Sequence, residues 1–165
     1  MANLQQSIAN KADVKQGEDY IDAEQQKQLN YNDAVTNAET IINETSQPTL
    51  DVNTINQAIN NVNQTKDALD GEERLDQAKT TATTALDGLS YLNQAQKARL
   101  TDNINHANHI ADVEQLTQTA NDLNQAMSDL QTGINNENDI LNSQNYQDAS
   151  PDNNCLLYTS DAADE

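Results

Sequence analysis

The sequence predicts an all-α protein, built as tandem antiparallel three-helix bundles that a long shared helix joins into an elongated rod. Three observations support this fold class. Apolar residues recur at alternating spacings of three and four from Val113 to Ile134, as on one face of a helix. One stretch of the chain occurs twice. Turn and capping residues divide the remainder into amphipathic runs of a length typical of small bundles.

The repeated stretch is residues 1–23, which match residues 127–149 at nine positions without a gap. Composition alone would give two amphipathic helices a similar apolar stripe. It would not explain the pairs Tyr20/Tyr146 and Asp22/Asp148, which lie beyond the stripe. We therefore read the chain as one period of a repeat that is cut inside a helix.

The first unit is expected to span residues 1–70. Residues 1–19 form the end of a helix whose apolar stripe comprises Leu4, Ile8 and Val14. Asp22 is the expected N-cap of a second helix, over residues 23–44. Pro48 then interrupts helical structure.

The third helix of this unit is predicted over residues 52–69. Asp51 is its expected N-cap, and its inward-facing residues are expected to be Val52, Ile55, Ile59, Val62 and Leu69. Asp70-Gly71 resembles a helix C-terminal stop.

The second unit is expected over residues 71–130. Its first helix covers residues 72–86 and ends at Asp87-Gly88. Asn93 and Gln96 have the spacing of a capping box, which predicts a short helix to about residue 107.

Asp112 is the expected N-cap of the long helix, which is predicted to continue to about Ser143. Its first half closes the second bundle. Its continuation, residues 131–152, would open a further repeat that is truncated here. The apolar stripe beyond Met127 is therefore expected to be exposed.

The charge balance excludes several classes of partner. With 27 acidic and 8 basic residues, the net charge is −19. Nucleic acid and anionic membrane surfaces are disfavoured, because both require a basic face. No apolar run is long enough to cross a membrane, and the single cysteine allows no internal disulfide.

No residue pattern predicts catalysis. His106 and His109 have a spacing that could place two metal ligands on one helix face, but no further cysteine or histidine completes a site. We expect both histidines to be solvated near a helix end. Gly-rich phosphate loops, nucleophile elbows and calcium loops are absent from the sequence. The prediction is a protein that is not an enzyme and has no cofactor and no metal site.

Residues 153–165 differ from the rest of the chain. Cys155-Leu-Leu-Tyr-Thr-Ser-Asp-Ala-Ala-Asp-Glu165 breaks the helical pattern and the repeat. The segment can be back-translated into a nucleotide string that resembles a transposase-type sequencing adapter read in frame. We therefore expect residues 153–165 to be a non-native tail.

Two sets of motifs resemble known repeat modules. Tyr20-Ile-Asp-Ala-Glu-Gln-Gln-Lys-Gln, Ser46-Gln-Pro-Thr-Leu and Val62-Asn-Gln-Thr-Lys-Asp-Ala-Leu-Asp-Gly71 are similar to the FIVAR module. Leu75-Asp-Gln-Ala-Lys, Ile104-Asn-His-Ala and the stripe from Val113 to Met127 are similar to the GA-like module that alternates with it. The resemblance covers residues 1–152 and is to the repeat arrays of giant staphylococcal matrix-binding surface proteins.

The resemblance implies a function as well as a fold. It implies a cell-wall-associated, extracellular adhesin whose bundles form a rod, with links to fibronectin, matrix attachment and envelope integrity under osmotic stress. GA modules also include albumin binders, which use aromatic and basic residues on the second helix and its preceding loop. The corresponding residues here are Tyr91, Lys97 and Arg99, so these are the candidate ligand contacts. The region from Gln94 to Arg99 contains no aromatic residue, which makes albumin a doubtful partner.

Overall fold

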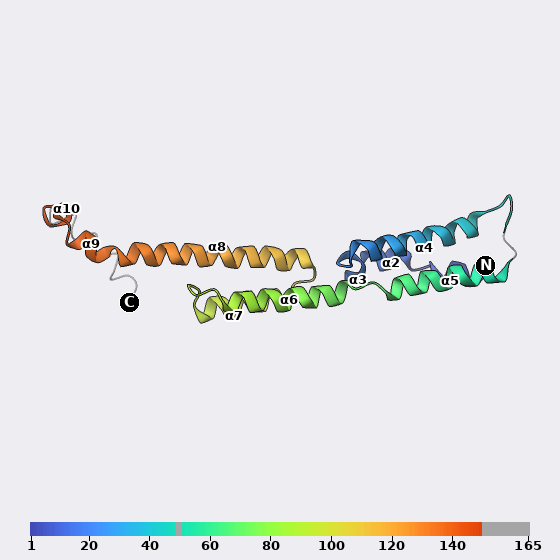
Figure 1. The fold of residues 1–165 in the computed structure, drawn as a ribbon, viewed down its shortest axis with the longest axis horizontal. Helices are drawn as coiled ribbons and strands as arrows, with labels where there is room; N and C mark the ends of the chain where they lie inside the picture. The colour runs from blue at the N-terminus through green and yellow to red at the C-terminus, as the bar shows by residue number, and fades with distance from the viewer. Residues whose placement is uncertain (49–50, 150–165) are drawn as a thin grey trace.

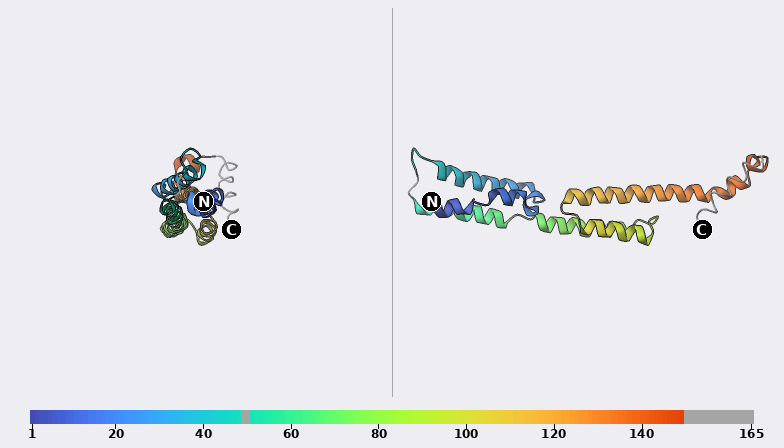
Figure 2. Two further views of the ribbon diagram at one scale, coloured as in Figure 1. Left: turned by 90° about the vertical axis from the view of Figure 1, so that its right-hand side faces the viewer. Right: turned by 180° about the vertical axis from the view of Figure 1, so that it is seen from behind.

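The computed structural model describes residues 1–48 and 51–149, and these ranges contain helices and connections but no strand. The helices form two bundles placed end to end, followed by a further helical extension (Figure 1). Viewed along the long axis, the molecule is narrow (Figure 2). The predicted all-α rod is confirmed. The expected non-native tail, residues 153–165, lies outside the described residues.

The first bundle consists of a broken helical segment packed on a helical hairpin. The hairpin is α4 (Gln25–Asn43) and α5 (Val52–Asp67). The predicted single helix over residues 1–19 is wrong: the segment comprises α1 (Ala2–Ser7), α2 (Lys11–Gln16) and α3 (Glu18–Ile21). It breaks around Ile8 to Asn10, and again at Gly17, whose backbone is extended.

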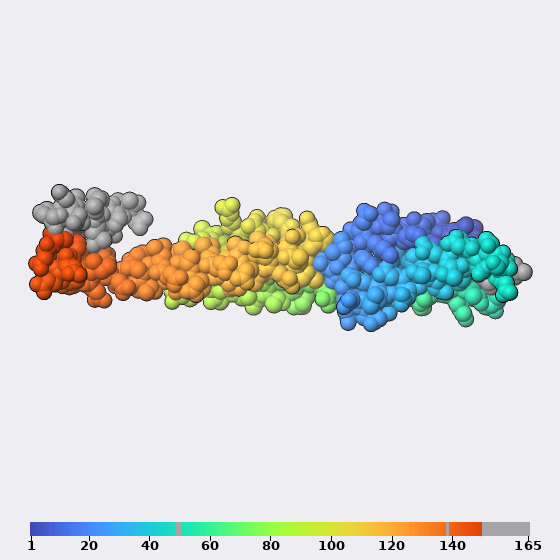
Figure 3. All heavy atoms as spheres, turned by 90° about the horizontal axis from the view of Figure 1, so that it is seen from above, coloured from blue at the N-terminus to red at the C-terminus, as the bar shows by residue number. Residues whose placement is uncertain are grey.

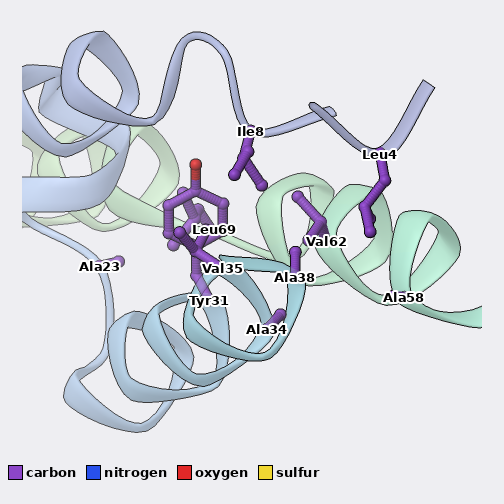
Figure 4. Packing of buried hydrophobic residues seen from close by; sticks show 10 residues of the cluster. All are labelled: Leu4, Ile8, Ala23, Tyr31, Ala34, Val35, Ala38, Ala58, Val62 and Leu69. Carbon is purple, nitrogen blue, oxygen red and sulfur yellow. The ribbon is translucent and has the colours of Figure 1, made fainter. Parts of the chain in front are cut away.

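The core of the first bundle is aliphatic around one tyrosine (Figure 4). Leu4 and Ile8 from the N-terminal segment point towards Val62 of α5. The alanines Ala34 and Ala38 of α4 and Ala58 of α5 are buried in this core, and small residues permit close helix packing. The buried residues are Leu4, Ile8, Ala23, Tyr31, Ala34, Val35, Ala38, Ala58, Val62 and Leu69. Val52, expected to face inward, is instead 65% exposed, because it begins α5 directly after the connection from α4.

Tyr31 is buried together with its hydroxyl group. Its ring meets that of Tyr20 edge to face at 6.1 Å between ring centroids. The Tyr20 hydroxyl accepts a hydrogen bond from Asn32 Nδ2, whereas the Tyr31 hydroxyl has no hydrogen-bond partner within the described residues. Burial, and to a lesser degree the neighbouring Tyr20, raises the pKa of Tyr31 above its usual value.

Replacing Tyr31 by phenylalanine should therefore stabilise the protein. An unsatisfied buried polar group costs about 1–3 kcal/mol, so Y31F should raise the free energy of unfolding by about 1 kcal/mol in urea titrations at pH 7. The matched variant Tyr20→Phe loses the hydrogen bond from Asn32 and should therefore lower the free energy of unfolding. Equal effects of the two variants would contradict this account of the Tyr31 hydroxyl.

The raised pKa of Tyr31 also predicts an alkaline limit. The unfolded chain releases the phenol proton near pH 10, while the folded chain holds it to higher pH. The unfolded state thus ionises first, so the contribution of Tyr31 to the free energy of unfolding is constant below about pH 10 and falls above it. Urea titrations at pH values from about 9 to about 11 bracket the ordinary tyrosine pKa. Over this range the free energy of unfolding should fall less for Y31F than for the wild type.

The second bundle consists of α6 (Gly71–Asp87), α7 (Gln94–Asn105) and the first half of α8 (Ile110–Asn135). Asn93 and Gln96 form the predicted capping box at the start of α7. The predicted N-cap at Asp51 of α5 is also confirmed. The core contains no aromatic ring among its buried members, which are Leu75, Ala82, Leu86, Leu92, Leu100, Ile104, Ala107, Val113 and Ala120.

The long helix α8 is shorter than predicted. It begins at Ile110, two residues before the expected cap Asp112, and ends at Asn135 instead of near Ser143. Two short helices follow, α9 (Glu137–Leu141) and α10 (Gln144–Gln147). The distal part of α8 continues beyond the ends of α6 and α7 (Figures 1 and 3).

Candidate interaction surfaces and the joint between the bundles

The joint between the two bundles is made by acidic side chains that cap helices of the other bundle. Asp22 follows α3 in the first bundle and is buried, with its side chain 7% exposed. Its Oδ1 accepts a hydrogen bond from the Ile110 N–H at 3.1 Å, and its Oδ2 lies 3.1 Å from His109 Nδ1. Asp22 thus caps α8 across the joint, and the prediction that it caps residues 23–44 is wrong.

Asp19 makes the equivalent contact with the start of α6. Its Oδ1 accepts from the Gly71 N–H at 2.9 Å. The backbones are so close here that a Cβ on Gly71 would lie 2.4 Å from the carbonyl oxygen of Asp19 and 2.5 Å from that of Glu18. Gly71 therefore begins a helix and permits this approach. The predicted helix stop at Asp70-Gly71 is wrong, since α5 already ends at Asp67.

Two further contacts complete the joint. Asp70 accepts from the Glu24 N–H at 2.9 Å, at the start of α4, and its Oδ2 lies 2.9 Å from Lys27 Nζ. Partial burial opposes ionisation of Asp70, but the Glu24 N–H and the Lys27 ammonium outweigh it and lower the pKa of this carboxyl. Arg74 Nε donates to the Asp22 carbonyl oxygen at 2.9 Å. The joint is therefore held from both sides by directional bonds, which favours a fixed orientation of the two bundles.

The helix N-termini explain why acids gather at this joint. The first N–H groups of a helix lack intrahelical partners and carry partial positive charge. α8 has no side-chain cap of its own, because His109 occupies the N-cap position without such a bond. α6 likewise has no side-chain cap bond from Asp70. Asp22 and Asp19 supply these bonds from the neighbouring bundle.

Replacing Asp22 by alanine should destabilise the protein, because the N–H group at the start of α8 loses its hydrogen-bond acceptor. Loss of a partner for buried donors costs about 1–3 kcal/mol, so D22A should lower the free energy of unfolding of the second bundle by this amount in urea titrations. The repeat offers a matched control in Asp148→Ala, since Asp148 is exposed. If D22A and D148A were equally stable, Asp22 would not contribute this cap.

The distal face of α8 exposes apolar residues that have buried counterparts at the start of the chain. Leu130 is 56% exposed and Ile134 is 50% exposed. Their repeat equivalents Leu4 and Ile8 are 0% and 9% exposed, under the hairpin of α4 and α5. Ile140 on α9 continues the exposed stripe. The expected exposure of the stripe beyond Met127 is confirmed for these three residues, and it marks a candidate docking surface.

The C-terminal segment repeats the backbone conformation of the N-terminal one. Ser143 has φ −72° and ψ 148°, against −76° and 149° for its equivalent Gly17. Asp148 has φ −89° and ψ −2°, against −95° and 0° for Asp22. α8 also breaks at Asn136, the equivalent of Asn10. The similarity between the segments therefore extends from sequence to local structure, although no equivalent of the hairpin covers residues 137–149 among the described residues.

The predicted ligand contacts lie around the connection between α6 and α7. Tyr91 is 47% exposed, and its N–H donates to Asn124 Oδ1 of α8 at 3.0 Å. Arg99 is exposed on α7. Lys97 Nζ donates to the Asp87 carbonyl oxygen at 2.8 Å and so supports the C-terminus of α6. Tyr91 and Arg99 are thus accessible, while Lys97 already has a structural contact.

Of the two histidines, His106 is solvated as expected, whereas His109 makes a contact across the joint. His106 is exposed, with Nδ1 2.8 Å from the Asp102 carbonyl oxygen. His109 belongs to the joint through Asp22. Sequence reasoning missed this role because the two residues are 87 positions apart.

The described ranges contain neither a candidate metal site nor a candidate membrane span. In residues 1–48 and 51–149, no cluster of three or more histidine, cysteine or acidic side chains has the geometry to hold a metal ion. None of the helices described is both long and apolar enough to span a bilayer.

The chain is similar to two known families of repeat module and to bacterial matrix-binding proteins. The FIVAR domain model matches residues 1–70 and 126–163, and the GA module model matches residues 72–126. Over 151 residues the chain is 52% identical to the extracellular matrix-binding protein EbhB of Staphylococcus aureus strain N315, and also to the extracellular matrix-binding protein ebh of strain JH9. These matches cover 92% of the chain but 4% and 1% of the two relatives, so the chain spans a small part of their length.

Solved structures agree with the sequence matches. A crystal structure of an EbhA domain from Staphylococcus aureus has a TM-score of 0.88 and 34% identity, covering 99% of this chain and 64% of that one. A second Staphylococcus aureus domain, described as similar to streptococcal adhesins, has a TM-score of 0.68 and 39% identity, covering 75% and 97%. From its family matches, its repeat and its fold together, the chain belongs to the FIVAR domain family and carries a GA module between its two FIVAR segments.

Proposed function

We propose that the chain is a structural unit of a rod-shaped adhesin on a bacterial cell wall, and that it contributes to extracellular-matrix attachment and envelope integrity. In this proposal residues 1–70 form a FIVAR bundle and residues 71–130 form a GA bundle. Residues from 131 open the next FIVAR bundle. The relatives' name, extracellular matrix-binding protein, supports the adhesive role.

The observation that carries the rod is the exposed pair Leu130 and Ile134 on α8, the helix that also closes the second bundle, together with exposed Ile140 on α9. A helix shared between neighbouring bundles transmits orientation along the array. Each unit then contacts only its neighbours, as in other repeat proteins, and length is gained by repetition. The acidic surface keeps such an array soluble and disfavours self-association.

A longer protein built from this sequence tests the rod. The internal offset places Ala23 opposite Ala149, so residues 1–149 can be followed directly by residues 24–149; we call this protein the extended chain. The junction provides residues 127–149 with a second copy of the hairpin α4–α5. Small-angle scattering should show a particle about twice as long as the single chain and equally narrow. A compact particle, with the units folded back on each other, would contradict the rod.

Matrix binding is tested separately. Titration of the single chain against fibronectin at physiological salt should show no submicromolar complex, because a spacer unit attaches through many weak contacts that add by avidity. A submicromolar complex would contradict the spacer function and would show that the chain is a dedicated binding module.

The alternative function is binding of serum albumin by the GA module. The exposure of Tyr91 and Arg99 favours it, since aromatic and arginine side chains often anchor interfaces. The contact of Lys97 with Asp87 disfavours it. Albumin titration of the wild type and of the double variant Y91A/R99A decides between the functions: albumin binding that is lost in the variant supports the alternative.

A further inference from the structure

We propose that Asp148 and Asn145, at the end of the chain that the structure describes, form a docking face for the N-termini of two helices in a following GA-type bundle. This inference rests on the proposed function and adds the chemistry by which one unit recognises the next. The occupant is specified by the joint seen within the chain, where the equivalent residues Asp22 and Asp19 bind the starts of α8 and α6.

The first argument is geometric. Asp148 has nearly the same backbone angles as Asp22, and both follow a four-residue helix. The Asp148 N–H donates to the carbonyl oxygen of Gln144 at 2.9 Å, as the Asp22 N–H donates to that of Glu18 at 3.0 Å. The docking conformation therefore exists before any bundle occupies it, which lowers the ordering cost of binding.

The second argument concerns the acceptors. In the occupied joint, Asp22 is buried by its contacts with His109 and Ile110. Asp148 is exposed. Asn145 stands where Asp19 stands in the first unit, and an asparagine oxygen also accepts a hydrogen bond from a helix N–H. Both acceptor positions of the joint are therefore retained in the second segment, with one negative charge fewer.

The third argument defines the partner. The occupied joint tolerates no side chain at Gly71, where a Cβ would overlap two carbonyl oxygens of the α3 segment. The partner is therefore a bundle whose first helix begins with glycine. Its third helix has no side-chain cap of its own, so that its first N–H can donate to the docking face, as the Ile110 N–H of α8 donates to Asp22. A bundle with a self-capped third helix or a larger first residue would not fit.

The extended chain tests this inference by amide hydrogen exchange. The second copies of Gly71 and Ile110 should be protected as the first copies are. Asp148→Ala should accelerate exchange at the second copy of Ile110 by about tenfold, the equivalent of one lost hydrogen bond, while the second copy of Gly71 keeps its acceptor in Asn145. Asp148→Asn, which keeps one acceptor oxygen, should have a smaller effect.

Two controls assign the effect. Asp139→Ala removes an exposed acid of α9 and should change no joint amide. The first copies of Gly71 and Ile110 report folding within the same molecule and should be unaffected by Asp148→Ala. Unchanged exchange at the second copy of Ile110 in Asp148→Ala would overturn the docking face while leaving the rod intact. Failure of the extended chain to protect residues 130–140 would instead overturn the proposed function.

Discussion

Replacing Gly71 by alanine should separate the two bundles without unfolding either core. The added methyl group would lie 2.4–2.5 Å from two backbone carbonyl oxygens, and backbone atoms cannot rotate away as a side chain would. α6 must therefore move off α3, which breaks the bond from the Gly71 N–H to Asp19. Overpacking of this kind costs about 1–3 kcal/mol. Urea titration should show the loss, and small-angle scattering should show a more variable angle between the bundles.

Gly133→Ala is the matched control, because nothing lies within 4 Å of a Cβ at that position in α8. Glycine inside a helix is less stable than alanine by about 0.5–1 kcal/mol, so this variant should be slightly more stable than the wild type. The same substitution thus has opposite signs at the two positions. A Gly71→Ala protein with wild-type stability and unchanged scattering would show that the close approach at the joint is not required.

Truncation of two equivalent leucines should have very different costs. Leu4 is fully buried against α4 and α5, whereas Leu130, one repeat later, is 56% exposed. Leucine-to-alanine substitution in a core costs about 2–5 kcal/mol, so L4A should destabilise the first bundle by this amount in urea titrations. L130A should change the stability of the single chain by about 0.5 kcal/mol or less.

In the extended chain, by contrast, L130A should be strongly destabilising. There the second copy of the hairpin covers Leu130, and L130A should then cost as much as L4A. If L130A remained neutral in the extended chain, the equivalence of the two segments would be limited to sequence and local backbone. This comparison keeps the substitution constant and changes only the presence of the covering hairpin.

The helices and their amphipathic faces could be predicted because their signals are local. The caps at Asp51 and Asn93 were correct since each carboxylate or amide oxygen accepts from an N–H two or three residues further along. The sequence motif and its partner lie within one turn. Periodicity likewise identified Leu4, Val62 and Val113 as core residues.

The errors concern bonds between distant residues. Asp22, Asp70 and Asp112 all had the local context of a cap or stop, but the actual partners of Asp22 and Asp70 lie 88 and 46 positions away. The pair Asp70-Gly71 predicts a helix end, because the close backbone approach that requires glycine here leaves no local signal in the sequence. The breaks near Asn10 and at Gly17 were missed since the apolar spacing continues across them. The joint could thus be found from the structure but not from periodicity.

Amide exchange over residues 130–140 tests the central claim most directly, that α8 and α9 carry the first helical segment of a following bundle. In the single chain these amides should exchange rapidly, since Leu130, Ile134 and Ile140 are exposed. In the extended chain they should become as protected as residues 4–14, which pack on the first hairpin. Equal and rapid exchange in both proteins, or strong protection already in the single chain, would contradict the claim.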